Sequence, residues 1–424
     1  MTLIILFGLL LVTLVAGLPL PFSIGVSSLA AIIALDVPLT IVPQRLVAGM
    51  DSFAFLAIPF FLLVGEVMNA GGLTTRIIKF SNVIVGHMRG GLAQITVVAS
   101  MFFGGISGSA TADLSAIGSI LIPSMKREGY DPEFAVAMTS CAATCGPIIP
   151  PSITMIIYGI LANVSITQLF LGGYVPGIMM GLGFMVVNYF ISRRRNYPMY
   201  ERSSLRKMLA VCWEASGAVI LPFIILGGLL SGVFTVTEAA GVSAVYAIVI
   251  SVFVYRDLKW RDLPHILAVT AIKSGVLMTV AASALIFAWV LSYLEVPQMI
   301  VTALFSITRD KHMILLMLNI LFLIVGCFME AKASMLILLP VILPVIPQVG
   351  IDLIHFGVVI TFNLLVGLIT PPVGLCLSLG AKIGDVPLGR AAVAAVPFVT
   401  VQLVILFLIT YIPGLILWLP KHQW

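Results

Sequence analysis

Two short stretches of the sequence combine glycine with paired prolines inside long apolar segments. They are residues 146–151 (Gly-Pro-Ile-Ile-Pro-Pro) and residues 367–372 (Gly-Leu-Ile-Thr-Pro-Pro). Proline removes an amide donor and disfavours helical geometry at the residue before it, so a helix must break at both places. Carbonyls that lose their helical partners, together with the Thr370 hydroxyl, are oxygen ligands of the kind that a hard cation such as Na+ accepts. A plain proline kink is the alternative interpretation of each motif.

Two further stretches carry small, hydroxylated or charged residues inside apolar segments. Residues 103–111 are mostly small or hydroxylated, and helix-terminal amides exposed there could hold an anionic group. Residues 326–334 place Glu330 and Lys332 two positions apart, an energetically costly placement that marks either function or mutual pairing. Lys332 is therefore a candidate contact for an anionic substrate, with pairing to Glu330 or exposure to water as alternatives. The candidate substrate-binding residues are Ser107, Ser109, Thr111, Lys332 and Ser334.

Three other charged residues also lie within apolar stretches, namely Asp113, Glu66 and Lys273. Asp113 lies just beyond residues 103–111, where it could help order an ion site or only cap a helix or pair locally. Glu66 lies near the end of an apolar stretch, which favours interfacial pairing or a side chain that reaches toward the surface. Lys273 has no partner that the sequence reveals.

The composition places these motifs in a membrane protein. Of 424 residues, 61% are hydrophobic and only 9% charged, whereas soluble proteins average about 25% charged residues. The charges are too few to solvate a globule of this size, which excludes a soluble enzyme. Nucleic-acid binding is excluded as well, because the Lys and Arg residues stand in short clusters between apolar stretches. The expected surroundings are a lipid bilayer.

We predict an all-α integral membrane fold with about ten transmembrane helices and two re-entrant hairpins. The hairpins are expected at about 91–125 and 313–346, because both stretches are interrupted by residues that a straight, lipid-exposed helix would not tolerate. The ten expected spans are about 2–18, 21–35, 51–70, 132–162, 168–191, 213–232, 236–255, 264–292, 353–383 and 391–418.

An internal repeat relates the two groups of motifs. A shift of 221 residues aligns 105–159 with 326–380 without a gap, with eleven identities in 55 positions that are mostly Gly, Pro and other backbone-shaping residues. In the predicted topology the two copies start on opposite sides of the membrane, so the repeat is inverted. Inverted repeats with broken helices are typical of secondary transporters, which bind substrate and ions where the copies meet.

The basic residues predict the orientation. Sixteen of the 22 Lys and Arg fall on one side of the predicted topology and four on the other. The positive-inside rule then places both termini outside. Two amphipathic stretches, 72–90 and about 297–311, each precede a hairpin and are expected to lie in the interface. The predicted segments are 1–90 and 164–312 (scaffold helices with interfacial arms), 91–163 and 313–385 (transport repeats) and 386–424 (C-terminal scaffold helix).

Four parts of the sequence together resemble the large membrane subunit of TRAP transporters, the DctM/SiaM type. They are residues 57–73 (Ala-Ile-Pro-Phe-Phe-Leu-Leu-Val-Gly-Glu-Val-Met-Asn-Ala-Gly-Gly-Leu), 107–110 (Ser-Gly-Ser-Ala), 147–152 (Pro-Ile-Ile-Pro-Pro-Ser) and 370–374 (Thr-Pro-Pro-Val-Gly). The combination is specific, although each piece alone would be weak. The resemblance extends over essentially the whole chain.

The resemblance implies a sodium-driven, tripartite importer of organic acids in a bacterial inner membrane. A periplasmic substrate-binding protein would deliver the substrate, and a small four-helix membrane subunit would partner this one. Because the sequence starts with its first span, we expect that small subunit to be a separate polypeptide. The transport domain would move as an elevator against a static scaffold. Carried onto matching positions, one sodium site would use backbone around Gly105, Ser107, Gly146, Ile149 and Pro151, and the second Gly326, Gly367, Thr370 and Val373.

Other functions fit the sequence less well. The nearest alternative is a stand-alone carboxylate or ion carrier with the same hairpin architecture, which would need no binding protein. An enzyme is not expected, because no metal-binding histidine motif or acid–base arrangement can be assembled from the five histidines. A channel is disfavoured because an inverted two-hairpin repeat suits alternating access better than an open pore.

Overall fold

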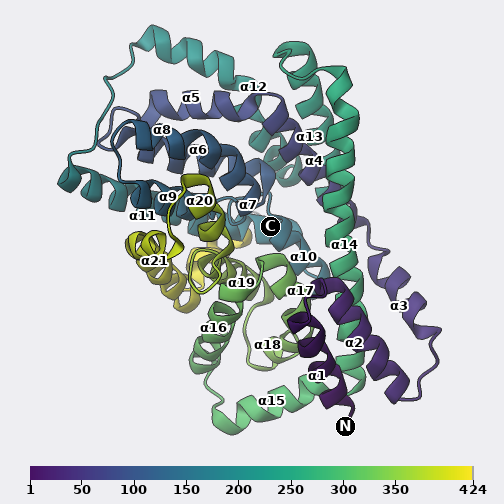
Figure 1. Ribbon diagram of the computed structural model, residues 1–424. Helices are drawn as coiled ribbons and strands as arrows, with labels where there is room; N and C mark the ends of the chain where they lie inside the picture. The colour runs from purple at the N-terminus through teal and green to yellow at the C-terminus, as the bar shows by residue number, and fades with distance from the viewer. Residues whose placement is uncertain (423–424) are drawn as a thin grey trace.

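The computed structural model describes residues 1–422, and within this range every regular element is a helix. Figure 1 shows the long α14 beside a larger body of shorter, packed helices. Within residues 1–422, seven helical stretches are long and apolar enough to cross a membrane. They are Phe53–Ala70, Ile166–Arg195, Leu205–Leu230, Val236–Val254, Trp260–Tyr293, Lys311–Phe328 and Leu388–Tyr411. The prediction of an all-helical chain with many apolar helices is confirmed.

One group of helices surrounds α14 (Leu263–Tyr293). This helix packs against α2, α3 and α4, while α13 packs along α4 and α12. A small apolar core joins α1, α2 and α14 through Leu6, Ile24 and Phe287. The remaining bounds are Thr2–Val15 for α1, Leu20–Ala34 for α2, Ile41–Met50 for α3, Phe53–Leu56 for η1, Ala57–Ala70 for α4, Leu205–Leu230 for α12, Val236–Val249 for α13, Ile250–Val254 for η3 and Trp260–Asp262 for η4.

Both stretches predicted as hairpins fold into helices separated by a turn. In the first, α6 (Gly91–Ser107) ends at Gly108, whose φ of +59° lies in the left-handed region that favours glycine. The chain then continues through α7 (Ala110–Asp113), η2 (Leu114–Gly118, a π-helical turn) and α8 (Ser119–Arg127), which packs back against α6. The second consists of α16 (Lys311–Phe328), α17 (Ala331–Ile342) and α18 (Val345–Gln348). The amphipathic helices α5 (Leu73–Val85) and α15 (Val296–Ile307) precede them.

Both proline motifs interrupt a helix, as predicted. The first divides α9 (Pro132–Ala143) from α10 (Ile153–Ala162), and the second divides α19 (Leu353–Gly367) from α20 (Leu375–Gly384). Each break contains a cis peptide bond between its paired prolines. At the first break the Ser152 hydroxyl donates to the carbonyl of Pro147 at 2.5 Å and accepts from the amide of Met155.

The prediction of a single span over 391–418 is wrong. Helix α21 (Leu388–Tyr411) ends within the predicted span, and a separate helix, α22 (Gly414–His422), begins after a short interruption. Pro413 explains the interruption, because it disfavours helical geometry at Ile412, whose φ and ψ are −120° and 78°. Helix α3 (Ile41–Met50) was not predicted from the sequence either.

The long α11 (Ile166–Arg195) packs against α21 and α22 in the larger body.

Each hairpin touches the broken helix of its own repeat backbone to backbone. A Cβ added at Gly326 would lie 3.3 Å from the Cα of Gly367, and one added at Gly104 would overlap the backbone of Gly146. Such close contact leaves no room for side chains at these positions. The two glycines of each pair therefore fix the distance between hairpin tip and helix break.

This contact gives a prediction for Gly367→Ala. The new Cβ would overlap the backbone of Gly326, so we expect the variant to lose roughly 1–3 kcal/mol of stability, the usual effect of overpacking. Thermal unfolding in detergent measures the loss. The matched control is Gly241→Ala in α13, where the added Cβ meets nothing within 4 Å. An equal effect of both substitutions would contradict the proposed role of the contact.

Candidate functional site

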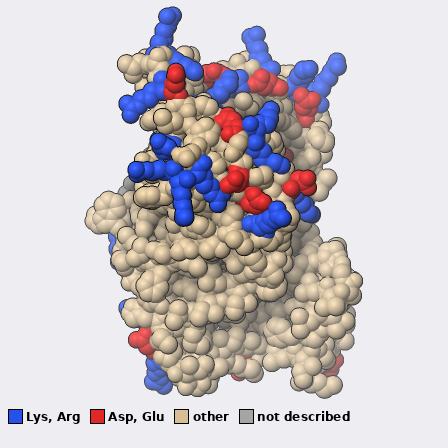
Figure 2. Space-filling model, turned by 60° about the vertical axis from the view of Figure 1, so that its left-hand side comes forward, with Lys and Arg blue, Asp and Glu red and all other residues tan. Residues whose placement is uncertain are grey.

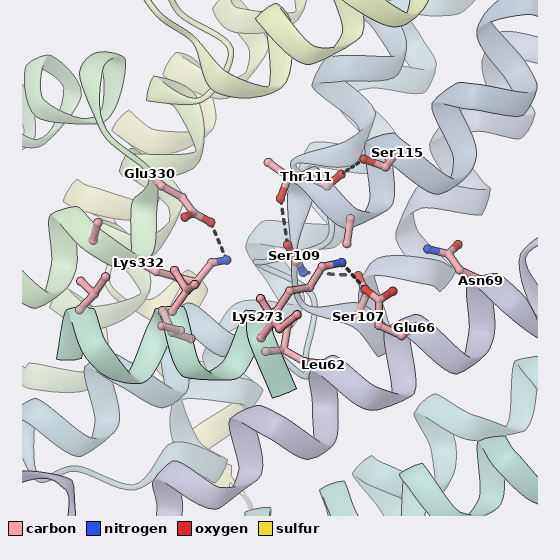
Figure 3. Close-up of a pocket in the computed structure, with 17 residues that line it drawn as sticks. Leu62, Glu66, Asn69, Ser107, Ser109, Thr111, Ser115, Lys273, Glu330 and Lys332 are labelled. Carbon is pink, nitrogen blue, oxygen red and sulfur yellow. Dashed lines mark hydrogen bonds and ion pairs between the residues drawn. The ribbon is translucent and has the colours of Figure 1, made fainter. Parts of the chain in front are cut away.

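A cavity of about 420 Å³ opens where the two hairpin tips face the helices α4 and α14. Figure 3 shows polar side chains from four segments pointing into this space. The lining residues are Leu62, Gly65, Glu66, Asn69, Ser107, Ser109, Thr111, Ala112, Ser115, Ile272, Lys273, Val276, Leu277, Val280, Glu330, Lys332 and Ala333. The two copies of the repeat thus contribute to one cavity, as the repeat predicted.

The first hairpin tip lines one wall with hydroxyl groups. The Ser109 amide donates to the Ser107 hydroxyl at 3.4 Å, and the hydroxyls of Ser109 and Thr111 lie 3.3 Å apart. Ser115 adds a hydroxyl that donates to the carbonyl of Thr111 at 2.7 Å. The structure therefore brings the predicted residues Ser107, Ser109 and Thr111 together. These hydroxyls can donate to the oxygens of a bound anion.

The second hairpin tip supplies a charged pair. The Lys332 ammonium lies 2.5 Å from the Glu330 carboxylate, and both residues line the cavity (Figure 3). Lys332 therefore pairs with Glu330, one of the alternatives that the sequence allowed, and it also lines the cavity. Ser334 does not line this space: it is fully buried, and its hydroxyl donates to the Glu330 carbonyl at 3.1 Å.

A second ion pair, which the sequence analysis missed, joins Glu66 of α4 to Lys273 of α14. The two residues are 207 positions apart, so no local spacing could have connected them. Their only signal in the sequence is that each is charged within an apolar stretch. Glu66 and Lys273 lie beside Ser107 and Ser109 of the first hairpin tip, on the opposite side of the cavity from Glu330 and Lys332 (Figure 3). The cavity is thus lined by two lysines and two glutamates, and each lysine is paired with one glutamate.

The first group of predicted ion ligands lies where hairpin and break meet. A Cβ added at Gly105 would lie 3.4 Å from the carbonyl of Pro150 and 3.6 Å from Ile149. Gly108 lies against the carbonyl of Pro151, and Gly104 against Gly146. The structure therefore assembles Gly105, Ser107, Gly146, Ile149 and Pro151 in two segments that touch.

Asp113 reaches the same region from the hairpin. Its side chain is fully buried, and one carboxylate oxygen accepts from Ser100 at 3.4 Å. The other oxygen has no hydrogen-bond partner among the described residues and faces Gly146, where an added Cβ would lie 3.7 Å away. A buried acceptor without a donor favours a nearby cation or proton.

The second group of predicted ligands is assembled in the same way but is more exposed. The amides of Val373 and Gly374 both donate to the carbonyl of Cys327 at 3.3 Å, which ties the break to the second hairpin. The Thr370 hydroxyl donates to Val366 at 2.7 Å and keeps its oxygen lone pairs available. Pro371, Pro372 and Val373 are exposed, whereas the whole first break is buried. Gly326, Gly367, Thr370 and Val373 thus belong to two segments in contact.

A cavity between paired hairpin tips, beside two broken helices, is an arrangement typical of secondary membrane transporters. The family model for the DctM component of tripartite ATP-independent periplasmic transporters matches residues 7–415. The chain is 43% identical over 377 residues to the C4-dicarboxylate TRAP transporter large permease protein DctM of Pseudomonas aeruginosa, covering 89% of this chain and 88% of that one. It is 36% identical over 409 residues to the sialic acid TRAP transporter large permease protein SiaM of Vibrio cholerae, covering 96% of both.

The chain therefore belongs to the DctM family, the large permeases of TRAP transporters. The resemblance noted in the sequence is confirmed, and so is the expectation of a transporter rather than an enzyme. The solved structure of the YdaH transporter from Alcanivorax borkumensis has a similar fold, with a TM-score of 0.65 over 89% of both chains at 17% identity. That likeness concerns the fold alone.

Proposed function

We propose that this chain is the large permease of a sodium-coupled TRAP importer of an organic acid in a bacterial inner membrane. The single observation that supports this most is the cavity itself, in which Lys332 and the hydroxyls of Ser107, Ser109 and Thr111 face one another beside both helix breaks. A lysine and several hydroxyl donors suit a carboxylate. Relatives named for C4-dicarboxylates and sialic acid, both organic acids, support the same substrate class.

In the proposed mechanism, substrate and sodium bind to the same moving body. The substrate carboxylate competes with Glu330 for Lys332 and accepts hydrogen bonds from the first hairpin tip. Sodium ions bind to the carbonyls at the two breaks, to the Thr370 hydroxyl and, at the first break, beside Asp113. Bound ions would hold each hairpin tip against its break, which completes the walls of the cavity. The hairpins and broken helices then move as an elevator against α4 and α14.

The proposal includes two partners and an orientation. A periplasmic binding protein delivers the acid, and a small four-helix membrane subunit completes the membrane complex, as family membership implies for the two partners. The basic side of the molecule faces the cytoplasm and both termini face the periplasm, as the distribution of Lys and Arg favours. The segment boundaries predicted from the sequence remain part of the proposal.

Reconstitution with one component left out tests this function. The chain, a small subunit and a binding protein encoded in the same genome are combined in proteoliposomes under an inward sodium gradient. We expect uptake of the binding protein's acid only when all three are present. Uptake by the chain alone would instead identify a stand-alone carrier of the same architecture.

Thr370→Ala tests the side-chain ligand at the second break. Its counterpart in the first repeat, Ile149, offers only a backbone carbonyl, so the second site should use one hydroxyl that the first lacks. We expect the sodium concentration for half-maximal uptake to rise by about tenfold, the effect of losing one ligand of roughly 1.4 kcal/mol. Thr370→Ser, which keeps the hydroxyl, is the control. An unchanged sodium dependence in a normally expressed Thr370→Ala variant would mean that the break is only a kink.

A further inference from the structure

A groove runs along the outer surface between α11 and α21, from the basic side of the molecule toward its middle. Its upper part is a cavity of about 530 Å³ bounded by Arg195 and Ile191 of α11 and by Arg390, Val393 and Pro397 of α21. Its lower part, of about 390 Å³, is bounded by Met179, Leu182 and Gly183 of α11 and by Thr400, Val401, Val404 and Ile405 of α21. On α21 the two parts adjoin between Pro397 and Thr400, and on α11 about two turns separate Gly183 from Ile191, so both parts lie along the same pair of helices.

The lower part has the surface of a lipid-exposed groove. Leu182 and Val404 are more than half exposed, although they are large apolar side chains. Gly183 allows the two helices to approach, because an added Cβ there would lie 2.5 Å from the Val401 side chain. The rings of Phe184 and Phe398, both fully buried, pack edge to face at 5.7 Å between the same two helices. The groove is shallow, apolar and open along its length.

The upper end is rimmed by charge. Arg195 pairs with Asp131, which also accepts a hydrogen bond from the Tyr197 hydroxyl at 2.7 Å. Arg390 is 72% exposed and lies 3.6 Å from Glu133, beyond hydrogen-bond range. Its guanidinium donates no hydrogen bond to any of residues 1–422. The two carboxylates thus leave most of the donors on both arginines available to an added anion.

Further basic residues surround this rim. Arg193 and Arg194 are exposed in the last turn of α11. Figure 1 places α9, α11 and α21 on the left of the molecule, the side that Figure 2 turns toward the viewer. Figure 2 shows Lys and Arg gathered with Asp and Glu in the upper part of that face, above a wide surface with few charged side chains. Arginines therefore outnumber carboxylates at this end of the groove, which gives it a net positive charge. The arginines are Arg193, Arg194, Arg195 and Arg390, and the carboxylates are Asp131 and Glu133.

We propose that this groove binds an anionic phospholipid, with its phosphate at Arg390 and Arg195 and one acyl chain along α11 and α21. A charged rim above an apolar track matches the two chemical halves of such a lipid, and basic pockets between helices on the cytoplasmic side recognise anionic headgroups. The site is separate from the substrate cavity. It touches α9 at Asp131 and Glu133, so the lipid contacts the helix that leads into the first break.

Native mass spectrometry of the purified full-length chain, titrated with phosphatidylglycerol or with phosphatidylcholine of the same acyl chains, tests the proposal. We expect retention of phosphatidylglycerol in preference to phosphatidylcholine. Arg390→Gln should weaken the binding of phosphatidylglycerol about tenfold, the effect of one charged hydrogen bond. The matched control is Arg194→Gln, which removes the same charge from the same rim without lining the groove. Val401→Trp, which fills the track, should weaken the binding of both lipids.

Each contrary result overturns a distinct part of this proposal. Equal losses in Arg390→Gln and Arg194→Gln would reveal only a general surface charge. Full displacement of the lipid by inorganic phosphate would reveal a free-anion site without an acyl track. A dimer that Val401→Trp dissociates would show that a second copy of the chain covers the groove. None of these measurements involves transport, so they are independent of the proposed function.

Discussion

Uptake is expected to fall to the level of protein-free liposomes when external Na+ is replaced by choline. The reason lies in the two helix breaks, whose backbone lies directly against the hairpin tips that line the cavity and whose carbonyls are the proposed sodium ligands. Without a cation, the oxygens at each break repel one another and the tip loses the ion that would hold it in place. The substrate cavity would then lack two complete walls. Initial rates of acid uptake in the three-component proteoliposomes measure this effect.

Two controls separate sodium coupling from a general need for salt. Equal Na+ inside and outside should support exchange but no accumulation, because the driving force is absent. Replacement of Na+ by K+ should abolish uptake as choline does, since the proposed sites would be too small for the larger ion. Undiminished accumulation under a proton gradient alone would overturn the proposed coupling and would turn attention to Asp113 as a proton carrier.

Lys332→Met is expected to reduce uptake efficiency by roughly 10- to 100-fold, because it would remove the proposed charged hydrogen bond to the substrate carboxylate. The same substitution leaves Glu330, now without its partner, facing the incoming anion. Methionine keeps a similar length, so the packing of α17 should change little. The rate of acid uptake against the concentration of loaded binding protein measures the loss.

Two further variants distinguish substrate binding from structural pairing. If Lys332 served only to neutralise Glu330, the double variant Glu330→Gln/Lys332→Met would recover normal uptake; we expect it to remain impaired. Lys207→Met removes an exposed lysine at the start of α12 and should have no effect. Normal uptake by Lys332→Met together with loss in Lys273→Met would assign the substrate contact to the opposite wall.

Several features of this chain could be predicted from local sequence because they depend on neighbouring residues. The helix breaks follow from paired prolines, which remove donors and exclude helical geometry wherever the chain places them. The turn at Gly108 and the costly charges at Glu330 and Lys332 have equally local causes. The internal repeat then predicted that the two hairpin tips would meet, and the cavity confirms it. The predicted span over 391–418 was wrong because Pro413, an equally local signal, disfavours helical geometry at Ile412 and ends α21.

Other features were decided only by the tertiary structure, because they join residues distant in sequence. Glu66 and Lys273 become partners only when α4 and α14 pack together, and nothing in the flanking residues signals it. One carboxylate oxygen of Asp113 has no hydrogen-bond partner among residues 1–422, and its position against Gly146 likewise follows from how the hairpin and the break pack. The sequence by itself determined where the helices break and which chemistry the tips carry. Packing decided which charges meet, because an ion pair depends on distance in space, and helix periodicity constrains that distance only within one helix.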